Sequence, residues 1–322
     1  MLTNKNSSDE EGWRNEMIKY GGEEMHKSLC LMINQLQVQG IPKQWQKMKI
    51  KSIYKGKGSR KEVGNRRGLF LSSILSKVVE KILLRRVEKQ MEIRKYQTGG
   101  KKGTSTVDSW MVLMAILDNN RRKNQKTYIL MADAEKCFDR LWLQDCLVDL
   151  KNAGLREKEV SLLYQMNEYA QIVVESPSGT KETITVNNIV KQGTVFGPIM
   201  CCVNSQKVNN MEEKNITLIS PSLHVEAMSY VDDIMGAGRQ EQIEVLGRNL
   251  RQMEIKKKYT FNNANGKSHY MIIKTGNDQE EDVEILVGKG KITRASEYKY
   301  LGNWIDERGT VERQISEVEN KS

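Results

Sequence analysis

The sequence predicts an α+β fold, in which helices and strands follow one another without a strict β-α-β alternation. Two observations support it. Apolar residues switch between the spacing of helices and the alternation of strands, and no repeat of about 20 to 50 residues is visible. The chain has 322 residues, of which 38% are hydrophobic and 29% charged, so it can bury a substantial core. These properties exclude solenoid, collagenous and disordered chains.

The first predicted strand lies in a strongly basic segment. The chain has a net charge of +10, and residues 43–67 hold ten lysines or arginines against the single acid Glu62. Residues 48–54 alternate apolar and polar, which predicts a half-buried strand, and residues 55–60, beginning with Lys55, form a charged turn. Such a segment can follow a phosphate backbone or bind a triphosphate, while charge alone leaves a solvated basic face equally open.

Two helices are expected next. Apolar residues recur three and four positions apart from Leu71 to Met91, which predicts an amphipathic helix that begins near Ser72 or Ser73. The glycine-rich segment 97–103 then breaks the chain, and residues 107–117 supply the apolar face of a second helix. We expect the apolar stripe of the first helix to pack in the core and to carry no chemistry of its own.

The remaining elements follow a buried strand. Residues 128–132 are a short apolar run typical of a strand buried on both faces, and the run ends at Asp133. A tight hairpin is expected around Tyr230, with Asp232 and Asp233 at its apex. The other predicted elements are helices over 141–153, 160–166 and 198–208, a hairpin of 172–174 with 183–186, a loop with Gln192 and Gly193, and a helix over 243–253.

The acidic residues at these strand ends are the strongest indication of chemistry. Adjacent carboxylates such as Asp232 and Asp233 repel one another between apolar strands unless a cation neutralises them. Oxygen ligands without nearby histidine or thiolate favour Mg²⁺ or Mn²⁺ over zinc, and the inferred chemistry is phosphoryl or nucleotidyl transfer. A solvated turn is the alternative for any single pair of aspartates, and the upstream Asp133 favours the metal site.

Other classes of site are not supported. The five cysteines form no C-x-x-C pair and the three histidines are far apart, so neither a zinc finger nor a disulfide framework is predicted. No signal peptide or membrane span is visible. We therefore expect a protein that is neither secreted nor membrane-bound and that resides in a reducing compartment, the nucleus or the cytoplasm.

The chain resembles the reverse transcriptase domain of non-LTR (LINE-type) retrotransposons, collinearly from about Ile41 to Gly302. Six segments carry the resemblance, in this order: Ile41-Pro42-x-x-Trp45, Asn65-Arg66-Arg67-Gly68-Leu69-Phe70-Leu71, Asp133-Ala134-Glu135-Lys136-Cys137-Phe138-Asp139, Lys191-Gln192-Gly193-Thr194-Val195-Phe196-Gly197-Pro198, Tyr230-Val231-Asp232-Asp233 and Tyr298-Lys299-Tyr300-Leu301-Gly302.

The resemblance implies a right-hand polymerase fold whose palm has an antiparallel sheet backed by helices. After a polar segment over 1–25, fingers and palm would occupy 26–303, with the fingers at about 41–125 and 154–188 and the palm at about 126–153 and 189–303. Residues 304–322 would begin a truncated thumb. The implied activity is RNA-directed DNA polymerisation, a nucleotidyl transfer that adds dNTPs to a DNA primer on an RNA template with two Mg²⁺ or Mn²⁺ ions.

The resemblance also implies residue roles. Asp133 and Asp232 would hold the metals, with Asp233 as an auxiliary ligand, and Phe138 would lie under the nucleotide sugar and exclude a 2′-hydroxyl. The alternative is that Phe138 is an ordinary phenylalanine buried in the core. The residues expected to contact the triphosphate or the template are Lys55, Arg67, Gln192 and Gly193, the last two having an ordinary turn as their alternative.

Some residues differ from the family pattern. Val231 replaces the commoner alanine, and Arg66 and Gly68 stand where tyrosine and proline are frequent. The segment 261–268 is longer than the usual Asn-x-x-Lys, which leaves the assignment of Lys267 as a general acid open.

Two other functions stay open at this point. With 21 residues after Leu301 and no preceding endonuclease, the chain could be an inactive transposon-derived remnant that binds nucleic acid. A viral RNA-dependent RNA polymerase shares the acidic hairpin, but Phe138 and the Tyr-x-Asp-Asp sequence argue against it.

Overall fold

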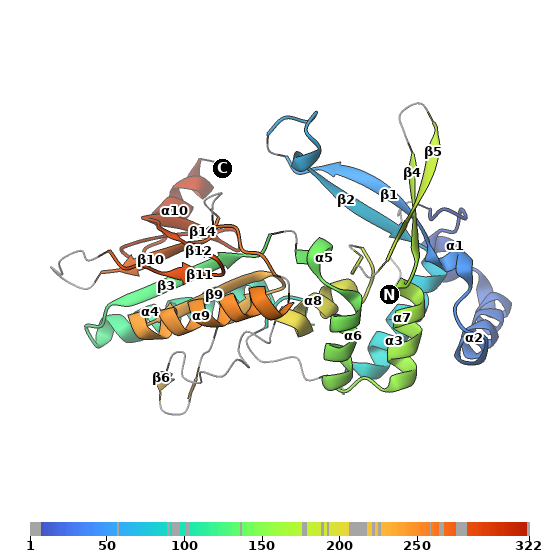
Figure 1. Cartoon of the computed structure of the whole chain (residues 1–322), viewed down its shortest axis with the longest axis horizontal. Helices are drawn as coiled ribbons and strands as arrows, with labels where there is room; N and C mark the ends of the chain where they lie inside the picture. Colours follow the sequence, from blue (N-terminus) through green and yellow to red (C-terminus); the bar gives the residue numbers. More distant parts are fainter. Residues whose placement is uncertain are drawn as a thin grey trace. The chain divides into compact units, whose positions relative to one another are not determined.

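The computed structural model describes residues 8–56, 58–88, 91, 97–100, 103–135, 137–175, 179–187, 190–191, 193–205, 218–220, 223–224, 227–257, 259–263, 267–274 and 282–320. Two compact units make up the chain, and each is built from two separate stretches of sequence (Figure 1). Unit 1 consists of Met1–Glu92 and Phe138–Met200, and unit 2 consists of Ile93–Cys137 and Cys201–Ser322.

Unit 1 contains a four-stranded sheet in the order β2-β1-β4-β5. β1 (Lys47–Tyr54) pairs antiparallel with β2 (Arg66–Ser72) and parallel with β4 (Ala170–Glu175), which pairs antiparallel with β5 (Lys181–Val186). The strand and the hairpin predicted in these regions are therefore confirmed.

The helices of unit 1 include the one predicted to begin near Ser72 or Ser73. Ser73 caps α3 by accepting a hydrogen bond from the Ser76 backbone N–H, so the helix begins at Ile74 and the predicted start is confirmed. The helix ends at Val87, and Met91 of the predicted apolar stripe lies beyond it. Leu71, which shares the helical spacing, lies before the helix in β2, opposite Lys49. The helices are α1 (Asn15–Lys19), α2 (Gly22–Gln39), η1 (Lys43–Gln46), η2 (Val63–Asn65), α3 (Ile74–Val87), α6 (Leu143–Asn152) and α7 (Glu157–Asn167).

Unit 2 contains a five-stranded sheet in the order β13-β10-β3-β9-β8. Its central strand β3 (Thr127–Asp133) is buried over its first six residues and pairs antiparallel with β9 (Asp233–Gly238) and β10 (His269–Ile273). β8 (Met228–Tyr230) forms the expected hairpin with β9, and β13 (Thr293–Arg294) runs parallel to β10. The predicted buried strand and acidic hairpin are confirmed.

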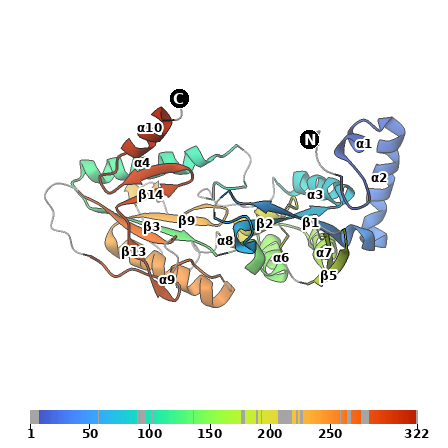
Figure 2. The same cartoon turned by 90° about the horizontal axis from the view of Figure 1, so that it is seen from above.

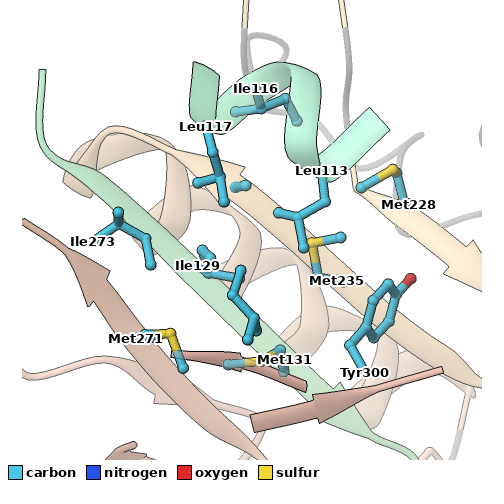
Figure 3. Close-up of a cluster of buried hydrophobic side chains, with 12 residues drawn as sticks. Leu113, Ile116, Leu117, Ile129, Met131, Met228, Met235, Met271, Ile273 and Tyr300 are labelled. Carbon is cyan, nitrogen blue, oxygen red and sulfur yellow. The ribbon is translucent and has the colours of Figure 1, made fainter. Parts of the chain in front are cut away.

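Helices cover both faces of this sheet. Figure 2 shows α4 (Thr106–Arg122) on one side of β3 and β9 and α9 (Gln240–Lys257) on the other. In Figure 3, Leu113, Ile116 and Leu117 of α4 lie over Ile129 and Met235 of the sheet. On the opposite face, α9 packs so closely that a Cβ on Gly236 would lie 2.3 Å from Leu246 Cδ2. Burial on both faces explains why β3 is a continuous apolar run over residues 128–132.

The rest of the described chain consists of short elements. The hairpin β14 (Glu297–Tyr300) and β15 (Asn303–Asp306) carries α10 (Glu312–Glu319), and the guanidinium of Arg313 stacks 3.5 Å from the Trp304 ring. The others are α5 (Cys137–Arg140), α8 (Gly197–Ser205), β6 (Leu218–Ser220), β7 (Leu223–His224), β11 (Leu286–Val287) and β12 (Gly290–Lys291). Residues 206–208 of the helix expected after Pro198 lie outside the described residues.

The boundaries of the two units differ from those of the expected fingers and palm. α4 belongs to unit 2, because its apolar face packs on the β3–β9 sheet, whereas α6 belongs to unit 1, where it contacts α7. The division into fingers and palm stays a prediction. Within the described ranges, no helix is long and apolar enough to cross a membrane.

Candidate active site

Two neighbouring strands of unit 2 bring carboxylates together. Asp133 at the end of β3 lies directly opposite Asp233 at the start of β9, and such pairs have Cβ atoms about 4.5–5.5 Å apart. Asp232 precedes Asp233 in the turn from β8 to β9, and all three acids are half-buried. The structure thus gathers the three predicted acids at one edge of the sheet, while their metal-binding role stays a prediction.

The carboxylates of Asp133, Asp232 and Asp233 at this end of the sheet repel one another. Burial, together with the carboxylates of Asp232 and Asp133, raises the pKa of Asp233 to about 7, against the opposing effect of Lys267. Burial and the charges of Asp233 and Asp133 likewise raise the pKa of the nearby Tyr298 to about 12. A bound cation would reduce the electrostatic repulsion among these carboxylates. Shifted pKa values of this kind are typical of functional sites.

A second segment of unit 2 frames Asp133. The Asn262 side-chain amide donates to Asp133 Oδ2, the Asn262 backbone N–H donates to the Asp133 carbonyl at 3.0 Å, and Ser268 Oγ accepts from the Asp133 backbone N–H at 3.2 Å. Lys267 Nζ lies 3.5 Å from Asp133 Oδ2. The sequence analysis assigned no role to Asn262 or Ser268, although both lie in the asparagine- and lysine-containing segment that it singled out.

The donor set fits a divalent cation that takes further ligands from a substrate. The candidate ligands Asp133, Asp232 and Asp233 offer carboxylate oxygens, which suit Mg²⁺ or Mn²⁺. Within the part of the chain that the structure describes, no three Asp, Glu, His or Cys side chains already converge as a metal site. Mg²⁺ in phosphoryl-transfer sites is held by one or two carboxylates and completes its shell with water and phosphate oxygens. The carboxylates of this edge therefore fit that mode of binding.

The predicted phosphate-binding residues lie in unit 1 and are exposed. Arg67 on β2 pairs with Ile53 on β1 and its side chain is open to solvent. Lys55 follows β1, and its ammonium donates to the Gly64 carbonyl at 2.9 Å, which fixes the base of the charged turn. Both side chains are accessible to an anion, as expected for a polyanion-binding face and equally for a solvated one.

The loop around Gly193, also in unit 1, is tightly held. Gly193 has a φ of +101°, and a Cβ there would lie 2.6 Å from the Phe70 carbonyl oxygen, so the position requires glycine. Gln192 lies outside the described residues. Phe138 on α5 is half-buried, 3.7 Å from where a Cβ on Gly197 would be, so it neighbours the loop without lying deep in a core.

Two buried ionisable groups to which the sequence assigned no role anchor this loop. Glu80 Oε2 accepts the backbone N–H groups of Val195 at 2.6 Å and Phe196 at 3.2 Å. The wholly buried Lys191 donates to the Met166 carbonyl at 3.0 Å, and burial lowers its pKa to about 8. An acid such as Glu80 beside the buried Val79 of α3 was the available signal, because carboxylates are rarely buried without a partner.

A protein family, several retrotransposon proteins and a solved structure are similar to this chain. A family model described as "Reverse transcriptase (RNA-dependent DNA polymerase)" matches residues 54–305. The polyprotein of the type-1 retrotransposable element R1 of Bradysia coprophila is 24% identical over 259 residues, which cover 77% of this chain and 24% of that protein. The corresponding R2 polyprotein of Popillia japonica is 25% identical over 165 residues, which cover 50% of this chain and 22% of that protein.

Two further matches extend the comparison. A probable RNA-directed DNA polymerase from transposon X-element of Drosophila melanogaster is 24% identical over 211 residues, covering 64% of this chain and 22% of that protein. The chain therefore spans less than a quarter of the length of these relatives. The structure of apo telomerase from Candida tropicalis superposes with a TM-score of 0.54 at 14% identity, covering 90% of this chain and 53% of that one. At this identity the likeness concerns the fold alone.

Proposed function

The chain belongs to the reverse transcriptase (RNA-dependent DNA polymerase) family and has a polymerase fold, and we propose that it is the catalytic domain of a non-LTR retrotransposon enzyme that copies RNA into DNA. It would add dNTPs to the 3′-hydroxyl of a DNA primer annealed to an RNA template. The observation that carries this proposal is the placement of Asp133 opposite Asp233, with Asp232 adjacent, at the end of a sheet buried on both faces.

The carboxylates supply the reactive centre. Asp133 and Asp232 would hold two divalent cations, Mg²⁺ or Mn²⁺, with Asp233 as an auxiliary ligand. Cations held there would supply the chemistry of lowering the pKa of the primer hydroxyl and neutralising the triphosphate oxygens. Because the pKa of Asp233 is raised to about 7, the Asp233 carboxyl group is protonated in roughly half of the molecules at neutral pH when no cation is bound.

Neighbouring residues of unit 2 would orient this centre. The Asn262 amide donates to Asp133 Oδ2 and thereby restricts rotation of that carboxylate. Lys267, 3.5 Å from the same oxygen, supplies a positive charge that partly neutralises the acids. The role of its ammonium as a proton donor to the departing pyrophosphate stays open, as it does from the sequence.

Unit 1 would contribute contacts to the nucleotide and the nucleic acid. The exposed Arg67 and Lys55 provide positive charge for the triphosphate or the template backbone. Gly193 and the preceding Gln192 would support the template and nucleotide, in a loop whose close approach to the Phe70 carbonyl requires glycine at 193. Phe138 would lie under the sugar and reject a 2′-hydroxyl. An enzyme acting on RNA, DNA and dNTPs would work in the nucleus or the cytoplasm.

A primer-extension assay tests the proposal. The purified chain is given an RNA template, an annealed DNA primer and dNTPs, with Mg²⁺, with Mn²⁺ and with a chelator. We expect extension that requires the cation and is abolished in Asp133→Asn. The matched control is Asp118→Asn, because Asp118 is an exposed aspartate on α4 that pairs only with Arg122 among its described salt bridges. Binding of the primer-template without extension under any cation would contradict the proposal and support an inactive nucleic-acid-binding remnant.

A further inference from the structure

We propose that Gln97 is a positioning residue for the acidic hairpin. Its buried side-chain amide clamps the backbone of Val231, and this clamp fixes where the carboxylates of Asp232 and Asp233 lie. The catalytic consequence of this inference rests on the proposed function, whereas the clamp itself does not. All the residues involved belong to unit 2.

Val231 needs to be held because its backbone is strained. Its φ is +60°, in the left-handed region, and it is the β-branched member among the four described non-glycine residues with positive φ, the others being Asn124, Tyr169 and Leu301. A β-branched residue keeps such a conformation only where its surroundings impose it, and such strain gathers at functional sites. Asp232 and Asp233 follow Val231 directly, so its conformation sets their direction.

The Gln97 amide provides that restraint. Gln97 Oε1 accepts the Val231 backbone N–H at 3.1 Å, and Gln97 Nε2 reaches both the Val231 carbonyl, at 3.5 Å, and Ser205 Oγ, at 2.9 Å. Ser205 Oγ in turn donates to the Val231 carbonyl at 3.0 Å. Both backbone polar groups of Val231 are therefore bonded to side chains. Because Gln97 is 1% exposed, water competes little for these hydrogen bonds.

The short segment Gln97–Gly99 that carries the amide is itself fastened to the hairpin. The Thr98 backbone N–H donates to the Ser229 carbonyl at 2.9 Å, and Gln97 forms a parallel bridge with Ser229. The Cys202 thiol donates to the Gly99 carbonyl at 3.0 Å. A Cβ on Gly99 would lie 2.3 Å from the Val231 backbone nitrogen, so only glycine permits this approach. The contacts of Gln97–Gly99 therefore hold this segment against the turn of the acidic hairpin.

A neutral amide suits this position better than a charged group. An acid in place of Gln97 would add to the repulsion between Asp232 and Asp233, and a base would compete with the cation that those carboxylates are proposed to bind. The glutamine supplies a donor and an acceptor without charge. In a nucleotidyl-transfer site a displacement of about 1 Å can lower the rate about 100-fold, so loss of the clamp affects catalysis before it affects substrate binding.

The test compares Gln97→Met with the wild type in two measurements. Methionine keeps the length of the side chain and removes all the hydrogen bonds of the Gln97 amide. In hydrogen–deuterium exchange followed by mass spectrometry, we expect peptides covering 228–235 to exchange at least about tenfold faster, with exchange elsewhere unchanged. In primer extension, we expect kcat to fall about 30- to 100-fold with the KM for dNTP within about threefold. Gln46→Met is the matched control, since Gln46 also bonds a backbone carbonyl but lies in unit 1.

The outcomes separate the clamp from the proposed function. Unchanged exchange over 228–235 in a folded Gln97→Met variant would overturn the clamp, whether or not the wild type is active. Faster exchange with full kcat would overturn the positioning role and leave the polymerase proposal intact. If the wild type extends no primer, the exchange measurement still decides the clamp. Should Gln97→Met fail to fold, Ser205→Ala, which removes one bond to the Val231 carbonyl, is expected to give the same increase in exchange to a smaller degree.

Discussion

The sheets of the two units differ in how they are covered. In unit 2, the six residues of β3 before Asp133 are all buried, because α4 and α9 pack on opposite faces. In unit 1, Met48 is the one buried residue of β1, and Lys47, Lys51 and Ile53 are exposed. The buried sheet ends in carboxylates and the exposed sheet carries lysines. The comparison teaches that a sheet buried on both faces leaves charged residues only at its strand ends, whereas a partly uncovered sheet presents lysines that are accessible to a polyanion.

The two units also hold their loops by different means. Glu80 and Lys191, both buried and ionisable, anchor the loop of Gly193. The neutral side chain of Gln97 anchors Val231 beside the acidic hairpin. A buried charge is tolerable where opposite charges and backbone N–H groups surround it, whereas a further charge next to Asp232 would alter the pKa values of the site itself.

The largest expected effect concerns the exposed sheet. Reversing Lys47, Lys49 and Lys51 to glutamate should weaken RNA binding at least about 100-fold at low salt. It should also flatten the slope of log affinity against log salt by about 2 to 3, since each lost phosphate contact removes about 0.7–0.9 of slope. Exposed lysines elsewhere serve as the control, in the triple variant of Lys158, Lys256 and Lys289 to glutamate. A wild-type affinity that does not depend on salt would make the basic segment a solvated face.

The next largest effect concerns the buried anchor of unit 1. Glu80→Ala leaves the N–H groups of Val195 and Phe196 without their acceptor and removes the charge that faces Lys191. We expect a loss of about 3 kcal/mol in the free energy of unfolding, measured by urea denaturation. Glu157→Ala, which breaks an exposed contact with Lys151, should change stability by less than about 0.5 kcal/mol. Equal effects of the two variants would contradict the anchoring role of Glu80.

Phe138 is expected to have a smaller effect, on selectivity. If it lies beneath the sugar, Phe138→Ala should raise kcat/KM for ribonucleotides relative to deoxyribonucleotides about tenfold, with the cation dependence unchanged. A packing role predicts instead a lower melting temperature and equal loss of activity towards both nucleotides. Phe138 is half-buried, so its truncation should cost less stability than that of a core phenylalanine. A destabilised variant with unchanged sugar preference would exclude the selective role.

The smallest expected effect is the pH dependence of stability in the metal-free protein. The pKa of Asp233 is raised to about 7 in the folded chain and is about 4 when unfolded, so the folded state binds the proton more tightly. Its contribution to stability is full below about pH 4 and is lost as the pH rises through 7. With a chelator present, the melting temperature should fall by a few degrees over this range, and Asp233→Asn should flatten the decline. An identical decline in both proteins would contradict the crowding of charge.

The sequence predicted the elements that depend on local patterns. β3 and the acidic hairpin follow from short apolar runs that end in aspartate, and the helical spacing over 107–117 predicts α4. The face that this spacing indicates is only partly buried, since Val107 and Met111 are exposed while Leu113 and Ile116 pack in the core. The contacts that hold the site could not be predicted, because they join residues distant in sequence. Gln97 meets Val231 across 134 residues and Glu80 meets Val195 across 115. Leu71 fits the helical spacing of the residues that follow it, and only its pairing with Lys49 shows that it belongs to β2.

The claim that the three aspartates form a cation-dependent catalytic centre is tested most directly by Asp232→Asn, measured for primer extension and for thermal stability together. Removing this charge relieves the repulsion on Asp233 and removes a proposed metal ligand. We expect extension to fall at least about 1000-fold while the melting temperature of the metal-free protein rises by a few degrees. A folded Asp232→Asn variant that extends the primer at the wild-type rate would contradict the account.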